Sequence, residues 1–373
     1  MRKATSRKNK KFLANIKNKV LKVRIMRSFS PMQLAIIMLI TGVVGYLVIR
    51  SFAATGLVSS LKPPIQGVAT RSGPPTSHTS FINSYVVNIN WSDLQPASAS
   101  GFVPDKIKSA IDAAKLKKAT IKLRIFAGDK SPTWVKNLDG SPVTYYEPED
   151  AKQPSYQIPR FWTPNYKRAY TDLHKKISAW FDRSPYVRDI TINGCMTVYA
   201  EPLIRGASDT RNITNLHAAG FTLEKDKQCQ KDQIAAHSIY KYTRSSIALN
   251  PYQAINDNNT VSMDVNFTNS LMDYCRQTLG NRCVLANNSI RDASTTSSPL
   301  GDNYTVMYSH MKSKGAPITF QTATSNKIGN WINTLNWAEA TMGANMVELN
   351  SDYGTYDATT LQQFDAKFEQ NTY

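Results

Sequence analysis

Residues 85–126 decide the fold, and they read YVVNINWSDLQPASASGFVPDKIKSAIDAAKLKKATIKLRIF. One apolar, β-branched run begins at Tyr85 and a second begins at Thr120, and both have the composition of buried strands. Between them, apolar residues recur at the spacing of one helix face, namely Ile107, Ala110, Ile111 and Ala114. The stretch therefore predicts a strand, a helix and a second strand, which is the repeating unit of a parallel sheet.

The same alternation continues along the chain. Eight short apolar runs predict strands: IQGVATR from Ile65, YVVNINW from Tyr85, TIKLRIF from Thr120, DITINGCM from Asp189, TVSMDVNF from Thr260, RCVLANN from Arg282, PITFQT from Pro317 and NMVELN from Asn345. Further helices are predicted in residues 164–183, where the apolar stripe includes Trp180, and in residues 328–338 and 361–368. Eight strands with intervening helices in about 310 residues match a closed barrel better than a doubly wound sheet. We therefore expect the α/β class and a single (β/α)8 TIM barrel over residues 65–373.

Composition and motifs argue against several classes of protein. With 41% hydrophobic residues and four cysteines in 373 residues, the chain resembles neither a disordered protein nor a disulfide-stapled miniprotein. It contains no G-x-G-x-x-G, P-loop, H-E-x-x-H, C-x-x-C or G-x-S-x-G motif, so nothing supports a nucleotide, zinc or serine-hydrolase site. Its five histidines show no ligand spacing. We expect no cofactor and no metal.

Basic residues are concentrated at the N-terminal end. Residues 1–50 contain twelve Lys or Arg and no Asp or Glu, which gives +12 of the net charge of +18. Residues 31–49 (PMQLAIIMLITGVVGYLVI) carry no charge and are long enough to span the hydrocarbon core of a bilayer. Because eleven of the twelve basic residues precede this segment, the positive-inside rule predicts a cytoplasmic N-terminus and an extracellular C-terminal domain.

These features divide the chain into a basic cytoplasmic segment at 1–30, a transmembrane signal anchor at 31–50, a linker at 51–64 and the barrel. The protein would then be a single-pass protein of the cell membrane. A buried core helix is an alternative for the apolar segment, and cleavage after Ala53, in the small-residue pattern SFAA, would instead release a secreted protein. We expect the basic residues to contact lipid and no nucleic acid, although RNA binding is an alternative.

All four cysteines follow the apolar segment, where disulfides persist if the domain is exported. The simplest pairing is local and joins Cys195 to Cys229 and Cys275 to Cys283. The sequence also allows the other disulfide connectivities, and it allows all four cysteines to be free buried thiols.

Polar and aromatic side chains gather where the predicted strands end, which is where a barrel of this kind builds its active site. They are Asn88, Asn90, Trp91, Arg124, Asn193, Glu201, Asp264, Asn266, Asn287, Asn288, Gln321, Glu348 and Asn350. Amides and carboxylates bond sugar hydroxyls, while aromatic rings cover the C–H face of a pyranose. The set predicts a carbohydrate site, and the residues expected to bind substrate are Asn90, Trp91, Arg124, Asn193, Asn266, Asn287 and Gln321.

Two stretches resemble clan A glycoside hydrolases of the β-galactosidase and cellulase type. Residues 86–135 are similar to the second and third βα units of that family, with the turn NWSDLQP…GFV and then PTWV. Residues 164–203 are similar to the helix and fourth strand that end in its acid/base Glu, which implies that role for Glu201. The chain departs from the family at Ala200, where Asn is expected, and at Gln321, where the family has its nucleophilic Glu.

The leading hypothesis is a membrane-anchored extracytoplasmic glycoside hydrolase acting on a surface or envelope polysaccharide. Glu201 and Glu348 would be its two catalytic carboxylates. The alternative is a catalytically inactive carbohydrate-binding barrel, supported by Gln321, and a third is a structural surface protein without a ligand. For each of these residues a structural role is an alternative to the functional one. Glu201 would pair with Arg205, and Glu348 with Arg124. Asn287 would lie in a turn, and Trp91 and Gln321 would be buried in the core.

Overall fold

Eight parallel strands close into a barrel in the computed structural model, which describes residues 58–147, 155–292 and 301–371. They are β1 (Gly67–Thr70), β2 (Ser84–Asn90), β3 (Thr120–Phe126), β6 (Val187–Thr191), β7 (Arg244–Ala248), β10 (Cys283–Ile290), β11 (Ile318–Thr322) and β12 (Met346–Leu349). Each strand pairs with the next of this series, and β12 closes the ring against β1, with Met346 opposite Gly67. The α/β class and the (β/α)8 barrel are confirmed.

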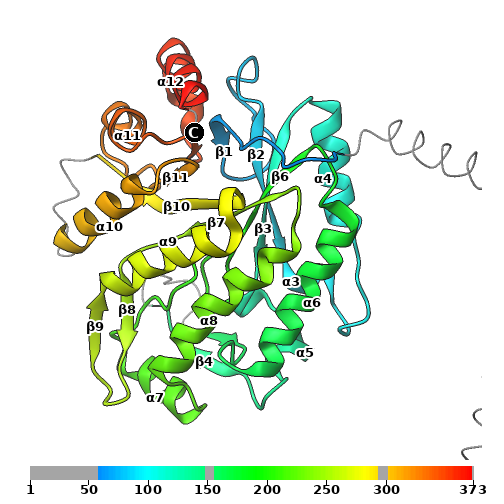
Figure 1. The fold of residues 1–373 in the computed structure, drawn as a ribbon, viewed down its shortest axis with the longest axis vertical. Helices are drawn as coiled ribbons and strands as arrows, with labels where there is room; N and C mark the ends of the chain where they lie inside the picture. Colours follow the sequence, from blue (N-terminus) through cyan, green and yellow to red (C-terminus); the bar gives the residue numbers. More distant parts are fainter. Residues whose placement is uncertain (1–57, 148–154, 293–300, 372–373) are drawn as a thin grey trace, which may run out of the picture. The chain divides into compact units, whose positions relative to one another are not determined.

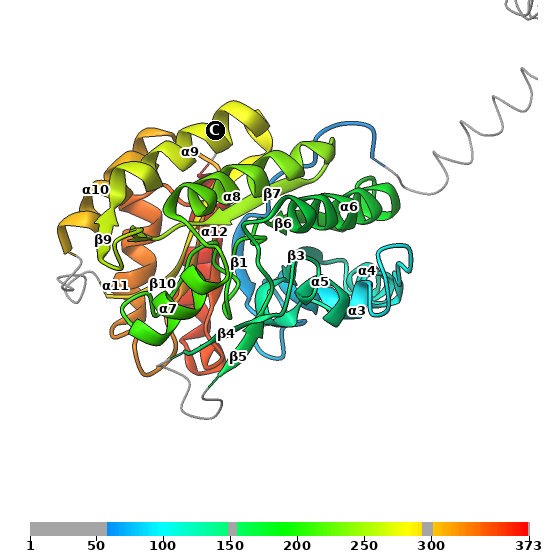
Figure 2. The same cartoon turned by 90° about the horizontal axis from the view of Figure 1, so that it is seen from below.

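Helices surround the barrel, as Figure 2 shows. The main ones are α4 (Asp105–Leu116), α6 (Pro164–Phe181), α8 (Leu223–Ala236), α9 (Val265–Leu279), α10 (Gly301–Ser313), α11 (Trp331–Asn336), which continues as a π-helical turn η5 (Trp337–Thr341), and α12 (Ala358–Gln370). The apolar stripe of α6 is buried as expected, except that Trp180 is 56% exposed. Its ring lies beside the ammonium group of Lys108 on α4, 4.6 Å from the ring centroid, rather than against the sheet.

Shorter elements are inserted after the carboxyl ends of several strands. They are α3 (Trp91–Leu94), η1 (Gly128–Lys130), α5 (Thr133–Lys136), the hairpin of β4 (Val143–Tyr145) and β5 (Tyr156–Ile158), α7 (Thr210–Ala218), and the hairpin of β8 (Tyr252–Ile255) and β9 (Val261–Asp264). In Figure 1 they lie together in the lower half of the view. Three short helical turns lie elsewhere in the described residues: η2 (His237–Ile239), η3 (Gly280–Arg282) and η6 (Tyr353–Thr355).

One predicted barrel strand is wrong. The run from Thr260 forms β9, which pairs antiparallel with β8 outside the barrel, and α9 begins directly after it at Val265. The fifth barrel strand is β7, between β6 and β10. Its sequence, RSSIA, has little apolar character because buried polar groups replace apolar ones; Ser245, for instance, bonds His237 Nδ1 at 2.9 Å.

The compact unit of the barrel begins at Val58, earlier than the expected start at Ile65. Lys62 is 2% exposed, and its ammonium group donates to the carbonyl oxygens of Ser184, at 2.9 Å, and Val187. Burial lowers the pKa of Lys62 to about 7, although Asp182 opposes this. Residues 58–64 of the predicted linker are therefore part of the folded unit, beside the start of β6.

The predicted basic segment, signal anchor and cleavage site lie outside the described residues. Among the residues that the structure describes, no helix has the length and apolar character needed to cross a membrane.

Both predicted disulfides are confirmed. Cys195 is bonded to Cys229, with Cα atoms 6.1 Å apart, and Cys275 is bonded to Cys283, with Cα atoms 5.8 Å apart. All four cysteines are used, so the alternative of free buried thiols is wrong.

Candidate functional site

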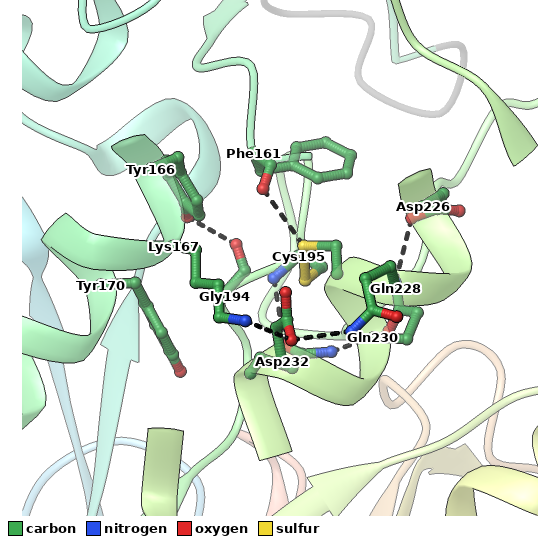
Figure 3. The surroundings of a disulfide bond; sticks show 12 residues. Phe161, Tyr166, Lys167, Tyr170, Gly194, Cys195, Asp226, Gln228, Gln230 and Asp232 are labelled. Carbon is green, nitrogen blue, oxygen red and sulfur yellow. Dashed lines mark hydrogen bonds and ion pairs between the residues drawn. A yellow bond between two sulfur atoms is a disulfide. The ribbon is translucent and has the colours of Figure 1, made fainter. Parts of the chain in front are cut away.

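The segment that follows β6 carries Glu201 and is fixed in place by its backbone. Cys195 binds the segment covalently to α8 through Cys229, and its N–H donates to Gln233 Oε1 on the same helix at 3.1 Å. Tyr166 of α6 donates its hydroxyl to the carbonyl oxygen of Gly194 at 2.5 Å (Figure 3). The segment is thus held between α6 and α8 a few residues before it reaches Glu201.

A cavity of about 440 Å³ lies beside Glu201. Its walls come from the segment after β6, the chain after β7, the end of β10, and the helices α10 and η5. The lining side chains include Glu201, Arg205, Asn250, Asn287, Asn288, Ser289, Ile290, Arg291, Tyr304, Tyr308, Lys327 and Trp337. This volume is within the range of small-molecule sites, roughly 300–1,000 Å³.

A hydrogen-bond network fixes the polar wall of the cavity. Asn250 donates its amide N–H to Glu201 Oε2 at 3.4 Å and accepts from Asn287 Nδ2 and from the Tyr304 hydroxyl, both at 3.0 Å. Asn287 in turn accepts from the Tyr308 hydroxyl at 2.9 Å. Because each partner orients the next, the donors and acceptors are held in fixed directions before any ligand arrives.

A β-bulge turns consecutive residues of β10 toward the cavity. The pairing with β11 skips Ser289, since Asn288 pairs with Gln321 and Ile290 with Thr322. Ser289 has a φ of +72°, which is uncommon for a residue with a side chain. In a regular strand only alternate residues share a face, so the bulge is what lets Asn287 and its successors line one cavity.

An aromatic wall stands on the side of α10. The rings of Tyr308 and Trp337 meet edge to face at a centroid distance of 4.9 Å, and Tyr304 lies 5.8 Å from Tyr308. Burial raises the pKa of both tyrosines, so their hydroxyls remain protonated donors across physiological pH. Rings with hydroxyl groups suit a ligand that has both C–H faces and polar edges.

Glu348 belongs to a different site inside the barrel. It is 1% exposed, and its carboxylate contacts Lys122 Nζ at 3.0 Å and Arg124 Nη2 at 2.5 Å. Gln321 donates to Glu348 Oε2 at 3.0 Å and accepts from Arg71 at 2.9 Å in the amide orientation that satisfies both partners. Burial opposes ionisation of Glu348, but Arg124 and Lys122 outweigh it and hold the pKa at about 2.

The structure therefore separates the residues that the sequence grouped. Glu201 and Asn287 line the cavity, whereas Arg124, Gln321 and Glu348 form the ion-pair network in the barrel and do not line it. The predicted partnership of Glu201 with Glu348 finds no support in this arrangement. The alternative pairing of Glu348 with Arg124 is the one that the structure shows.

Trp91 and Asn90 have structural roles. Trp91 is fully buried, its Nε1 donates to Gln95 Oε1 at 2.8 Å, and its ring meets that of Trp134 edge to face. A ring enclosed in this way offers no face to a substrate, so the alternative of a core position holds. Asn90 is the N-cap residue of α3, and its backbone N–H donates to Asp93 Oδ2 at 3.1 Å.

Asn266 and Asn193 also lie outside the cavity wall. Asn266 was expected at a strand end, but it is an exposed residue in the first turn of α9 because the Thr260 run is not a barrel strand. Asn193 follows β6 as expected and is fully buried; its side-chain amide has no hydrogen-bond partner among the described residues.

Sequence reasoning missed three central residues of the cavity. Asn250 was overlooked because it follows β7, which has no apolar signal. Tyr304 and Tyr308 are four residues apart on α10, a spacing that places them on one helix face. Two tyrosines at this spacing, on the helix that follows the polar end of the strand RCVLANN, are the sequence feature from which they could have been predicted.

A second cavity, of about 340 Å³, lies between α6 and α8 against the Cys195–Cys229 disulfide. Rings such as Phe161, Trp162 and Tyr166 form much of its wall, and the Tyr166 hydroxyl is already used by Gly194. It offers fewer oriented polar groups than the cavity at Glu201. In the described ranges, no three His, Cys, Asp or Glu side chains gather closely enough to hold a metal ion.

Comparison with known proteins bears on the fold. No family model matches the sequence, and no curated protein matches it. Among solved structures, the catalytic domain of the β-amylase from Paenibacillus polymyxa matches 84% of this chain and 100% of its own, with a TM-score of 0.54 at 12% identity. The fold is a (β/α)8 barrel, similar to that of this β-amylase domain.

Two further solved structures match with lower TM-scores. An endo-β-1,4-glucanase from Xanthomonas axonopodis pv. citri is 11% identical, with 82% of this chain and 100% of that chain covered and a TM-score of 0.47. Endo-glycoceramidase II from Rhodococcus sp. is 14% identical, with 82% and 80% covered and a TM-score of 0.46.

Proposed function

We propose that the cavity beside Glu201 binds an oligosaccharide. The observation that carries this proposal is the oriented network of Glu201, Asn250 and Asn287, to which the hydroxyls of Tyr304 and Tyr308 are hydrogen-bonded. Amide and carboxylate groups match vicinal hydroxyls, and the aromatic wall matches the C–H face of a sugar ring. The position at the ends of the fourth to sixth barrel strands is where such barrels carry their sites.

The geometry favours binding without turnover. Hydrolysis by the usual mechanism needs two carboxyl groups flanking the glycosidic bond. Among the described residues that line the cavity, Glu201 is the only acidic one. Glu348 is held in buried ion pairs, and Gln321 occupies the seventh strand, so a carbohydrate-binding barrel without catalysis is our first candidate.

Hydrolysis is the second candidate, and the burial of Glu201 favours it. Glu201 is 8% exposed and lines the cavity, with its carboxyl group next to the Asn250 amide, so it is positioned to give a proton to a glycosidic oxygen. The second reacting group would then come from the substrate, as in substrate-assisted glycosidases. In this case Glu201 is a catalytic residue, and in the first it is a hydrogen-bond acceptor for the sugar.

We also propose that the domain acts outside the cell, anchored by residues 31–50, on a surface or envelope polysaccharide. The support is the charge asymmetry of the N-terminal residues together with two disulfides, which persist in oxidising compartments. Protease treatment of intact cells is expected to degrade the barrel. Full protection of the barrel in intact cells contradicts this orientation.

A glycan-binding screen combined with a chromogenic-substrate screen of the full-length chain tests the function. Binding without product supports the first candidate. Product release that is lost in Glu201→Gln, while binding is kept, supports the second, since the substitution retains shape but removes the transferable proton. If no glycan binds and none is cleaved, both candidates are wrong.

Trp337→Leu tests whether the glycan occupies this cavity. Loss of the ring is expected to weaken binding roughly tenfold, about 1.4 kcal/mol. Trp180→Leu is the matched control, because Trp180 is an exposed indole on α6 that does not line the cavity. Equal effects of the two substitutions place the glycan elsewhere.

A further inference from the structure

We infer that the second cavity, between α6 and α8, is a separate binding site for the aromatic ring of a small ligand. Its volume of about 340 Å³ is within the range of small-molecule sites. Of the described residues that line it, none lines the cavity beside Glu201. A ligand of the second cavity therefore need not be a saccharide, whatever occupies the first.

The buried end of this cavity is formed by aromatic rings and a disulfide. Four buried side chains supply the rings, namely Phe161, Trp162, Tyr166 and Tyr170. In Figure 3 the two tyrosines of α6 lie on one side of the Cys195–Cys229 disulfide, and Gln228 of α8 lies on the other. The Phe161 carbonyl oxygen is 3.2 Å from Cys229 Sγ, so the chain that carries the first two rings packs against the sulfur atoms. Ring and sulfur surfaces both pack favourably against an aromatic group.

The polar groups at the buried end are already used within the protein. The Tyr166 hydroxyl donates to the carbonyl oxygen of Gly194 at 2.5 Å, and the Tyr170 hydroxyl is 3.1 Å from His237 Nε2. Gln233 uses both ends of its amide, one for the N–H of the cysteine that follows Gly194, at 3.1 Å, and one for a neighbouring glutamine of α8, at 2.7 Å. A sugar hydroxyl would give up its bonds to water and find these partners occupied. The buried end therefore suits an apolar group.

Charged and polar side chains stand at the entrance instead. Lys167, Lys225 and Gln228 line the cavity and are exposed. Asp232 Oδ1 accepts from Lys167 Nζ at 2.7 Å and from Gln228 Nε2 at 2.9 Å, which links α6 to α8 at the edge of the cavity. The cavity thus runs from a polar edge between two helices to buried rings. A ring that enters it can leave a polar substituent in water.

The geometry of the wall favours an aromatic ligand over an aliphatic one of equal size. The rings of Phe161 and Trp162 meet edge to face, with centroids 5.1 Å apart and planes at 84°. Trp162 meets Phe221 in the same way, at 5.2 Å and 89°. Ring edges carry partial positive charge and ring faces partial negative charge, so an aromatic ligand can extend this pattern. A saturated ring gains from burial alone.

Titration calorimetry of the full-length chain with 2-naphthol and its saturated analogue decahydro-2-naphthol tests this site. We expect 2-naphthol to bind about threefold or more tighter than the saturated analogue, because only the aromatic ligand can make edge-to-face contacts. The titration is repeated in the presence of cellobiose. Cellobiose is expected to leave the 2-naphthol affinity unchanged, since the buried polar groups have no free partner for its hydroxyls.

Two substitutions locate the bound ring. Gln228→Trp introduces a ring at the entrance from an exposed position of α8, so it is expected to weaken 2-naphthol binding about tenfold or more. Glu224→Trp is the matched control, because Glu224 is exposed on the same helix and does not line the cavity. Trp162→Leu removes a wall ring and is expected to weaken 2-naphthol more than decahydro-2-naphthol. If Trp162→Leu does not fold, Gln228→Trp still decides, since its position is exposed.

Three results would each refute the aromatic site. Equal affinity of the two ligands shows a general apolar surface. An unchanged 2-naphthol affinity in Gln228→Trp, or equal losses in Gln228→Trp and Glu224→Trp, places the ligand elsewhere, for example on the apolar residues 31–49. Displacement of 2-naphthol by cellobiose makes the cavity part of a saccharide site. A glycan screen without any binding would refute the proposed function and leave the 2-naphthol result standing.

Discussion

Glu201 and Glu348 show how surroundings give one residue type two roles. Glu348 is enclosed by Lys122 and Arg124, which hold its pKa at about 2, so it is a charged structural group at every physiological pH. Glu201 lies at a cavity wall with an amide partner. A buried charge pair is expensive to break, because the remaining partner keeps its desolvation cost.

Glu348→Gln is therefore expected to lower the free energy of unfolding by about 3–5 kcal/mol, since Arg124 would stay buried without its counter-charge and Lys122 would keep only the more distant carboxylate of Asp189, at 3.9 Å. Glu201→Gln is expected to lower it by less than about 1 kcal/mol. Urea unfolding of the full-length chain measures both. A Glu348→Gln protein as stable as the wild type would show that the ion-pair network is not what holds the barrel interior together.

At the scale of elements, the disulfide between Cys195 and Cys229 couples the segment after β6 to α8. A cross-link over a sequence separation of 34 stabilises by about 4 kcal/mol on the chain-entropy model, and one over 8 by about 2.5 kcal/mol. The first cross-link holds the segment that carries Glu201. The second joins α9 to the first residue of β10, at the end of the strand opposite the cavity.

The paired substitution Cys195→Ser with Cys229→Ser is expected to lower stability by about 4 kcal/mol and also to weaken glycan binding. Cys275→Ser with Cys283→Ser is expected to cost about 2.5 kcal/mol and to leave the affinity unchanged. Thermal unfolding and a binding titration, both below the melting transition, measure these effects. Unchanged affinity in the first pair would mean that α8 does not position the site.

Sequence patterns predicted elements where burial is apolar and failed where it is polar. The run TIKLRIF is apolar enough to be recognised as a strand, although it also carries Lys122 and Arg124 into the barrel. The strand RSSIA is buried through hydrogen bonds such as that of Ser245 with His237, so hydrophobicity gives no signal. The β-branched run from Thr260 was predicted as the fifth barrel strand instead. Asn250, which follows the true fifth strand, was therefore absent from the predicted site.

The candidate site shows the same limit. Glu201 was found because it follows a recognisable strand, and Asn287 because it lies near the end of one. Trp91 was assigned to the substrate because ring type and strand-end position do not reveal that Gln95 accepts its indole N–H inside the core. Whether Glu201 or Glu348 lies at a cavity depends on the direction of its side chain in the fold. The spacing of residues in the sequence does not reveal that direction.

At the scale of the whole molecule, two histidines are buried between α6, η2 and β7. The rings of His174 and His237 are 4.2 Å apart, His174 Nδ1 bonds the Tyr240 hydroxyl at 2.8 Å, and His237 Nε2 bonds the Tyr170 hydroxyl at 3.1 Å. Burial lowers the pKa of His174 from 6.5 to about 3, and burial together with His174 lowers that of His237 well below its ordinary value. Both are neutral in the folded protein.

The sign of the effect on stability follows from proton binding. Below pH 6.5 the unfolded chain binds a proton at His174 that the folded protein does not bind, so this histidine's contribution to stability is present above pH 6.5 and is lost as the pH falls toward 3. The loss is about 1.4 kcal/mol per pH unit. Asp189, Asp226 and Asp365 act in the opposite direction, because burial raises their pKa from 3.8 to about 6.

Since these contributions partly cancel in the wild type, the informative quantity is the difference in unfolding free energy between wild type and His174→Gln. That difference is expected to shrink by about 2 kcal/mol between pH 6.5 and pH 5, because the wild type loses the histidine contribution and the variant has none to lose. Ile177→Val is the control, since it removes a buried methyl group from the same helix and its cost does not depend on pH. Urea unfolding at pH 7, 6 and 5 measures all three proteins. If the stability difference between wild type and His174→Gln is as independent of pH as that between wild type and Ile177→Val, His174 is protonated in the folded barrel. A buried imidazolium would then be tolerated between α6 and β7.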